Sequence, residues 1–250
     1  MTFSPDTTVG ELAATCPAAI RVFQRRKVEF CCGGTRTLWQ LCQDTDTPYA
    51  TLSAELEQAI SEAPPRLTWA DRPLSELTAH IVEAFHDPLR HELPRLRQLI
   101  FKLQVHGDSH GQLLSAIHRV IDRFECLLLE RMAVEEQVVF PLIAALDTGV
   151  PGPEHQLSLA GYQEDADRFR RDVRWTLRML RAMTGDYVPP PTACPTWRAL
   201  YRSLEEFEQL MQMHVHLEIN VLFARAASVV GRLRGEEEMS RKTICPTSPS

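Results

Sequence analysis

The chain carries histidines and glutamates whose types and spacing suit a metal site. All nine histidines lie between residues 80 and 216. His214 and Glu218 are four residues apart, so one face of a helix presents both side chains. Imidazoles that terminate and carboxylates that bridge are the ligands of di-iron sites in helical bundles. The pattern is that of a metal site with the candidate ligands His86, His106, Glu135, His214 and Glu218.

The elements that must position these candidates are helices. Apolar residues recur every three or four positions, which predicts four long helices near 74–105, 110–146, 154–184 and 196–227. The candidate ligands fall on the apolar stripes of the first, second and fourth helices. Arg131 and Gln163 fall on the stripes of the second and third, and Val138 is expected to be buried beside Glu135. Inward polar groups are costly unless they are paired or bound to a metal. A metal site and a set of separate core hydrogen bonds and ion pairs therefore both remain open.

Residues 70–228 are expected to form an up-down four-helix bundle, because the four helices are joined by short connections. Pro88 and Pro94 should each kink the first helix or remove one of its hydrogen bonds. The tail, residues 229–250, is charged and then rich in Ser and Pro, which predicts disorder. The fold class expected for the chain is all-α.

A smaller helical domain is predicted over residues 1–62. Its first helix begins at a capping box, Thr8 to Glu11, and a second helix covers Ala18–Arg26. Two further short helices are expected at Thr37–Cys42 and Thr51–Ser61, before a proline-rich linker.

This small domain contains Cys31-Cys32-Gly33-Gly34, a second place where chemistry is expected. The two thiols follow three basic residues and a helix end whose backbone N–H groups are free, and both features lower a thiol pKa. The functional interpretation is thiol or metal chemistry. The structural one is a buried turn with two small residues, without a disulfide between adjacent cysteines.

Other residues of interest receive structural roles. The histidines outside the stripes, including His216 on the face opposite His214, are expected at the surface. The four tryptophans are expected to pack, and Cys126 and Cys194 are expected to be ordinary small residues.

Composition excludes several classes of function. The net charge of −6 argues against a nucleic-acid or anionic-membrane binder. No apolar run suits a transmembrane helix, and no secretory signal is visible at the N-terminus. Seven cysteines, an odd number, are expected to be reduced thiols in the cytoplasm. The sequence shows no catalytic triad, phosphate-binding loop or dinucleotide fingerprint.

Several segments resemble a known family. Phe30-Cys31-Cys32-Gly33-Gly34 resembles the ScdA-type N-terminal domain. Phe85-His86-Asp87, Glu135 to Pro141 and His214-Val215-His216-Leu217-Glu218 resemble its hemerythrin-like partner domain. In this order they resemble the iron–sulfur cluster repair di-iron proteins, also called repair of iron centres proteins.

The resemblance implies a non-haem iron protein of the bacterial cytoplasm, active in the response to nitric oxide and oxidative stress. It implies delivery of iron to damaged iron–sulfur proteins, so the chain is expected to be a metal-binding donor rather than a turnover enzyme. A homodimer is compatible with it. By position, His86, His106, Glu135, His214 and Glu218 match family ligands, and the two glutamates match its bridging carboxylates.

Two family ligand positions differ. Arg131 and Gln163 stand where the family has histidines. Arginine cannot ligate iron, and the glutamine amide is a poor ligand beside imidazoles. One hypothesis keeps iron at reduced stoichiometry, on His86, His214 and the carboxylates. A second is a metal-poor binding or regulatory protein in which the Arg131 guanidinium bridges Glu135 and Glu218. A third places the function on Cys31 and Cys32.

Overall fold

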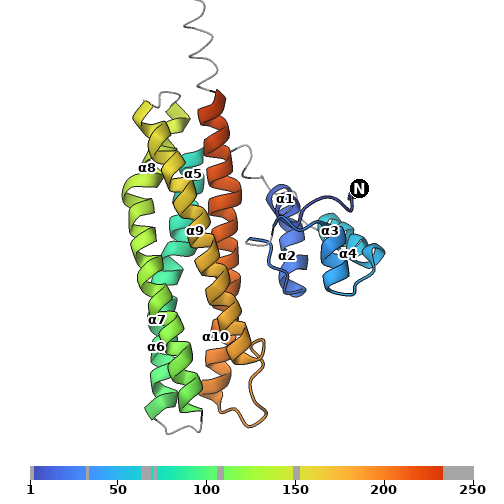
Figure 1. Cartoon of the computed structure of the whole chain (residues 1–250), viewed down its shortest axis with the longest axis vertical. Coiled ribbons are helices and arrows are strands. Elements are labelled where there is room, and N and C mark those ends of the chain that lie inside the picture. Colours follow the sequence, from blue (N-terminus) through green and yellow to red (C-terminus); the bar gives the residue numbers. More distant parts are fainter. Residues whose placement is uncertain are drawn as a thin grey trace, which may run out of the picture.

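The computed structural model describes residues 3–31, 34–62, 69, 72–105, 110–148 and 153–232, without the side chains of 153–160 and 163. Within these ranges regular structure is helical apart from one isolated bridge between Thr8 and Thr37, so the predicted all-α class is confirmed. A small helical unit lies beside a long bundle (Figure 1). None of the described helices is long and apolar enough to cross a membrane.

The N-terminal unit consists of four short helices, α1 (Val9–Thr15), α2 (Pro17–Arg25), α3 (Leu38–Asp44) and α4 (Tyr49–Ser61). The predicted capping box at Thr8 and Glu11 is present, and Thr37 forms a second one with Gln40. A Cβ on Gly34 would lie 2.9 Å from the Cα of Gly10, so Gly34 approaches α1 this closely only because both residues lack a side chain.

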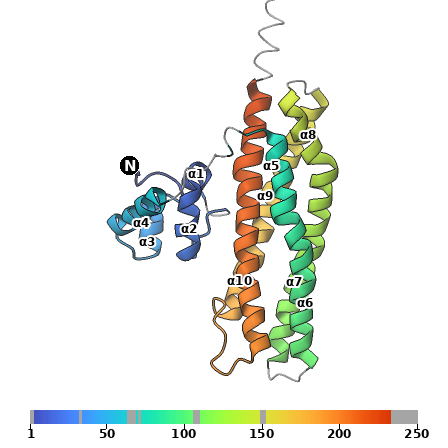
Figure 2. The ribbon, with the colours of Figure 1, turned by 180° about the vertical axis from the view of Figure 1, so that it is seen from behind.

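The bundle is made of long antiparallel helical rods that lie side by side (Figure 2). The first, second and fourth rods are interrupted by π-helical segments. The segments of each rod follow in chain order. The first rod is α5 (Leu74–Ile81), η2 (Val82–His86) and α6 (Asp87–Val105). The second is α7 (Gly111–Val134), η3 (Glu135–Val139), α8 (Phe140–Ala145) and η4 (Leu146–Thr148). The third is α9 (Pro153–Thr184), and the fourth is α10 (Pro195–Val215) with η5 (His216–Phe223) and a helical continuation to Arg232.

The fourth rod therefore extends four residues into the segment predicted as a disordered tail, because Val230 still packs on the core. The rest of that predicted tail, 233–250, lies outside the described residues.

The interruptions η2, η3 and η5 are π-helical segments, each with a widened turn. Pro88 and Pro141 each follow such a segment by two residues. A proline has no N–H to donate and its ring clashes with the carbonyl four residues earlier, so a widened turn just before it relieves both problems. The sequence prediction of a disturbed helix at Pro88 agrees with this arrangement.

The extra residue in η3 shifts the helix register. Val138, predicted to be buried, is 51% exposed, while Val139 and Ile143 are buried. The prediction was wrong because a period of 3.6 residues does not hold across a π-helical turn.

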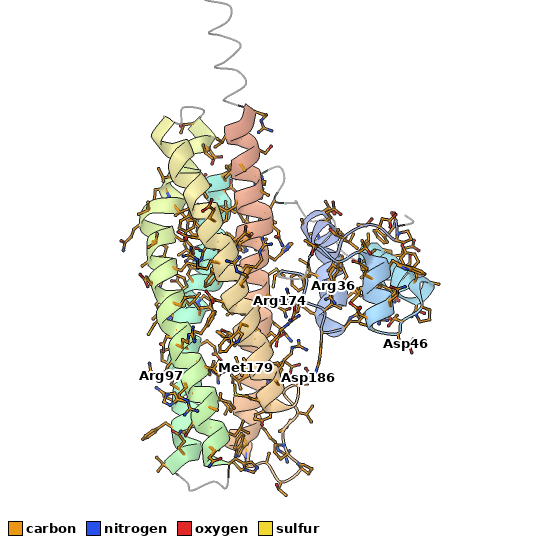
Figure 3. All side chains as sticks on the ribbon, viewed as in Figure 1. Arg36, Asp46, Arg97, Arg174, Met179 and Asp186 are labelled. Carbon is orange, nitrogen blue, oxygen red and sulfur yellow. The ribbon has the colours of Figure 1, made fainter. Side chains whose placement is uncertain are left out.

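Ion pairs join the N-terminal unit to the bundle, and Phe30 of the unit packs against His216 of η5. Lys27 pairs with Asp186, and Glu29 pairs with Arg178 and, less closely, with Arg174. Arg174 and Asp186 lie on the side of the bundle that faces the unit (Figure 3).

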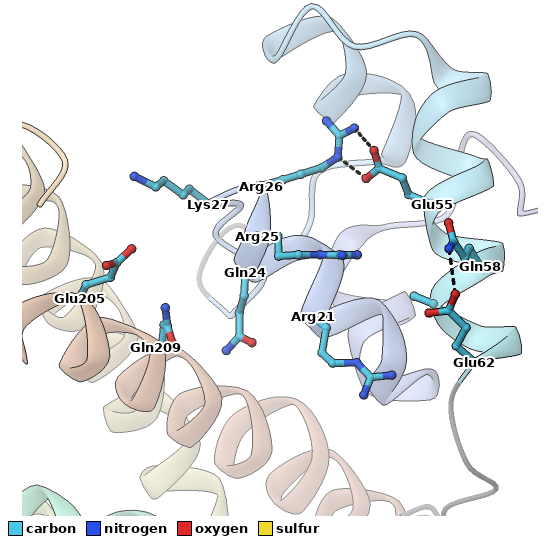
Figure 4. Close-up of a pocket in the computed structure, with 11 residues that line it drawn as sticks. Arg21, Gln24, Arg25, Arg26, Lys27, Glu55, Gln58, Glu62, Glu205 and Gln209 are labelled. Carbon is cyan, nitrogen blue, oxygen red and sulfur yellow. Dashed lines mark hydrogen bonds and ion pairs between the residues drawn. The ribbon is translucent and has the colours of Figure 1, made fainter. Parts of the chain in front are cut away.

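Beside this junction, a cleft of about 920 Å³ lies between α2, α4 and α10. Arg26 crosses part of its wall to pair with Glu55 of α4 (Figure 4).

Candidate metal centre

Four candidate ligands converge inside the bundle. His86 ends η2, Glu135 begins η3, and His214 and Glu218 lie at the junction of α10 and η5. All four are fully buried, with 0% exposure. The three π-helical segments therefore each carry or adjoin ligand candidates, as is frequent at functional sites.

The ligand atoms face one another at short range. The Nε2 atoms of His86 and His214 lie 3.1 Å apart. Glu135 Oε2 lies 3.4 Å from His86 Nε2, and Glu218 Oε2 lies 3.4 Å from His214 Nε2. Ligand atoms of His86, Glu135 and His214 all lie within 4.8 Å of one another. These three residues form the cluster, and Glu218 adjoins it through its contact with His214.

Two of these atoms show that the donor set fits a cation. Both Glu135 Oε2 and Glu218 Oε2 are buried, and neither has a hydrogen-bond partner among the side chains that the structure describes. A buried carboxylate oxygen without a partner is costly, and a metal ion is a partner that would remove the cost. Imidazole with carboxylate is a donor set suited to divalent iron.

The other oxygen of each carboxylate contacts Arg131. Arg131 Nε lies 2.7 Å from Glu135 Oε1, and its Nη2 donates to Glu218 Oε1. The guanidinium carbon lies 4.5 Å from the ring centre of Phe169 and 4.9 Å from that of Tyr162. The bridging of both carboxylates by Arg131, inferred from sequence, is present in the structure.

Electrostatics keep the two imidazoles neutral. Burial lowers the pKa of His214 to about 4, although the Glu218 charge opposes this shift. Burial also lowers the pKa of His86, against the opposing effect of its hydrogen bond with Glu136. Neutral imidazoles keep the lone pairs that a metal requires.

The two carboxylates behave differently. Burial would raise the pKa of Glu218, but Arg131 and His214 outweigh it and hold that pKa at about 2. Burial and the neighbouring Glu218 raise the pKa of Glu135 above its ordinary value, although Arg131 opposes them. A cation bound at Glu135 would therefore compete with a proton.

Two residues that the sequence analysis did not select support the centre. Glu136 Oε1 lies 2.7 Å from His86 Nδ1 and 2.6 Å from Arg90 Nη2. Because a carboxylate accepts only, His86 Nδ1 donates, and its Nε2 presents the lone pair to the site. Tyr162 donates from its hydroxyl to Glu135 Oε1 at 3.1 Å. Glu136 immediately follows a candidate ligand in sequence, whereas no sequence signal marked Tyr162.

The remaining predicted site residues either lie away from this centre or fall outside the described residues. His106, Cys32 and the side chain of Gln163 lie outside the described residues. Cys31 is 2% exposed and lines a cavity of about 10 Å³ against the bundle, with Arg174 and Arg181. The structure therefore places Cys31 at the contact between the two units.

The expectation that His216 lies at the surface is wrong. His216 is 1% exposed because the N-terminal unit covers that face of η5. Its ring packs edge-on against Phe30 at 5.6 Å and hydrogen-bonds the Ala13 backbone. Among the tryptophans, Trp197 is buried as expected, but Trp39 and Trp175 are about half exposed, at 51% and 48%. Trp175 instead contacts the Arg123 guanidinium from outside the core.

Two family models match separate parts of the chain. Residues 5–60 match ScdA_N, described as a domain of unknown function (DUF542), and residues 77–226 match the hemerythrin HHE cation binding domain.

The chain is also similar over its length to curated proteins. It is 34% identical to the iron-sulfur cluster repair protein YtfE of Pectobacterium atrosepticum, over 92% of this chain and 98% of that protein. It is 34% identical to the YtfE of Musicola paradisiaca, with the same coverage, and 31% identical to that of Citrobacter koseri, over 88% and 96%. The chain therefore belongs to the iron–sulfur cluster repair family that joins an ScdA-type N-terminal domain to a hemerythrin domain.

Proposed function

We propose that this protein holds iron in its bundle and supplies it to iron–sulfur clusters damaged by nitrosative or oxidative stress. The observation that supports this most directly is the pair of unpartnered carboxylate oxygens, Glu135 Oε2 and Glu218 Oε2, beside two neutral imidazoles. The relatives named as repair proteins support the same role. Its clients are iron–sulfur proteins of the cytoplasm.

The chain's own residues hold and release the cargo. His86, His214, Glu135 and Glu218 bind the ion, and Glu136 keeps the His86 ring oriented toward it. A damaged cluster of the 3Fe–4S type in its +1 state takes up one Fe²⁺ and one electron to become a 4Fe–4S cluster in its +2 state. The electron comes from an external low-potential reductant, so the protein itself supplies only the ion.

The test uses a dehydratase whose 4Fe–4S cluster has been oxidised to the 3Fe–4S form. The iron-loaded protein, mixed anaerobically with this client and dithionite, should restore client activity in proportion to the iron added. Protein carrying Glu218→Ala, prepared in the same way, should restore none beyond the buffer control. Equal recovery with both proteins would contradict the proposal.

A second candidate function is a metal-poor binding or regulatory protein. The observation that favours it is Arg131, which already neutralises part of the carboxylate charge without a metal. The iron content of protein purified anaerobically from iron-supplemented cells distinguishes the two functions, because this second function predicts a folded protein without bound iron.

A third candidate places the function on Cys31 and Cys32, either as iron acceptors or at a contact with the client. The intact Cys-Cys-Gly-Gly sequence favours it. Full repair activity after Cys31→Ser and Cys32→Ser would exclude it.

A further inference from the structure

The carboxylates of the centre are divided between two kinds of partner. Both Oε1 atoms face the Arg131 guanidinium, and both Oε2 atoms face the imidazoles of His86 and His214. Each carboxylate therefore lies between two places where a cation can sit. One is taken by the Arg131 guanidinium, and the other lies beside the imidazoles. This is the arrangement of a bridging carboxylate, with a side chain at one of the two positions.

Arg131 is fixed at its position from several sides. Its side chain is 8% exposed and contacts carboxylates from two rods. Phe169 and Tyr162 of α9 approach the guanidinium, and the Tyr162 hydroxyl also donates to Glu135 Oε1. A metal ion at the Oε1 atoms would have to displace the guanidinium and leave it buried without a partner, which is costly.

The guanidinium also cannot act as a ligand. It has no lone pair to donate, and it carries its positive charge in every state of the site. The residues present therefore fit one ion at the Oε2 atoms and do not fit a second at the Oε1 atoms.

We propose that Arg131 takes the place of a second metal ion, so that the bundle binds a single divalent iron through His86, His214, Glu135 and Glu218. The proposal deepens the proposed function, which requires bound iron but not its number.

A consequence concerns the protein without iron. The Arg131 charge offsets one negative charge of the Glu135 and Glu218 pair, so the site without an ion is less costly to bury. The same guanidinium repels an incoming dication, which weakens binding. Such a site keeps its fold without the ion and binds the ion less tightly. Both properties suit a protein that donates iron.

The test is the stoichiometry of Fe²⁺ binding, measured by anaerobic calorimetric titration and by metal analysis after gel filtration. The unmodified protein should bind one iron per chain. The double variant Arg131→His with Gln163→His should bind close to two. Arg123→His is the matched control, since Arg123 is an exposed arginine of the same helix, and it should still bind one.

Electron paramagnetic resonance provides an independent readout. After one-electron oxidation of the Fe²⁺-loaded protein with ferricyanide, one ferric ion per chain should give the signal of an isolated half-integer spin, whereas a coupled diferric pair would be silent.

Each other result would overturn the inference. Two irons, or none, in the unmodified protein would contradict the single-ion site. A folded double variant that still binds one would show that Arg131 does not set the number. Failure of the repair assay with one iron bound would instead contradict the proposed function alone.

Discussion

The Nε2 atoms of His86 and His214 face each other at 3.1 Å in the interior of the bundle. Because His86 Nδ1 donates to Glu136, His86 Nε2 can only accept, and the two facing nitrogens share one hydrogen. A metal ion that binds both nitrogens must displace that hydrogen, and the His214 ring then carries it on Nδ1, as the other neutral tautomer. The relationship connects residues 128 positions apart in sequence, on the first and fourth rods.

Glu136 should control the affinity of the site without binding iron itself. Glu136→Gln removes the charged acceptor of His86 Nδ1 and should weaken Fe²⁺ binding about 10- to 100-fold. Competition with a chromophoric chelator measures the change. Glu130→Gln, an exposed glutamate of the same rod, should leave the affinity unaltered. Equal Fe²⁺ affinities of the two variants would show that Glu136 does not control the site.

Arg131 should stabilise the iron-free bundle. Arg131→Ala leaves two buried carboxylates without their cation, which should cost about 3–5 kcal/mol. Urea unfolding of iron-free protein measures this loss, and added Fe²⁺ should recover part of it because the ion becomes the cation of both carboxylates. Arg123→Ala removes an exposed arginine and should change stability by about 0.5 kcal/mol or less. An unchanged unfolding midpoint for Arg131→Ala would count against the buried bridge.

The contact between the two units should protect Cys31 from thiol reagents. Cys31 is buried, whereas Cys126 and Cys194 are exposed and should react first. Glu29→Ala removes the ion pairs with Arg174 and Arg178. Exposed pairs contribute about 0.2–1 kcal/mol each, so the loss of both should quicken Cys31 labelling about two- to thirtyfold, as followed by peptide mass spectrometry.

Glu62→Ala, at the end of α4, is the control for this experiment and should not change the rate. Added salt should act in the same direction as Glu29→Ala, because it screens the pairs. Cys31 labelling as fast as that of Cys126 in the unmodified protein would contradict the protected position.

Asp147 should act as a distant cap of α5. Its carboxylate accepts from the backbone N–H groups of Leu74 and Ser75 at 2.9 and 2.8 Å. Burial raises the pKa of Asp147, but these hydrogen bonds outweigh it and lower the pKa below its ordinary value. Asp147→Ala should therefore cost about 0.5–2 kcal/mol near neutral pH, measured by urea unfolding.

The pH dependence of this loss has a fixed sign. A carboxyl whose pKa is lowered on folding stabilises the protein above its unfolded pKa, and the effect fades as the pH falls through the folded pKa. The difference between Asp147→Ala and the unmodified protein should accordingly shrink on acidification. A difference that grows at low pH would show that the carboxylate charge is not involved. Asp165→Ala, in an exposed pair on α9, should show little difference at any pH.

The sequence predicted most of the fold because helical periodicity and caps are local signals. The capping box at Thr8 and the four long rods follow from such signals. The bridge from Arg131 to Glu135 and Glu218 could also be anticipated, since the residues share inward stripes and opposite charge. By contrast, Val138 was misplaced because the π-helical turn before Pro141 adds a residue to the register.

Contacts between distant segments that no inward stripe or charge pairing indicates were not accessible from sequence. His216 lies opposite His214 on its helix, so periodicity placed it in solvent. It is buried because Phe30 and Ala13 of the N-terminal unit cover that face. Tyr162 is half-buried and reaches Glu135 from another rod, a contact that no spacing on its own helix indicates.

The most direct test of the central claim is a crystal structure of the protein grown with Fe²⁺, with anomalous diffraction recorded at the iron absorption edge. The single-ion account predicts one anomalous peak, within bonding distance of His86 Nε2, His214 Nε2, Glu135 Oε2 and Glu218 Oε2. Arg131 should remain on the two Oε1 atoms. Two peaks bridged by the carboxylates, with Arg131 displaced, would contradict it.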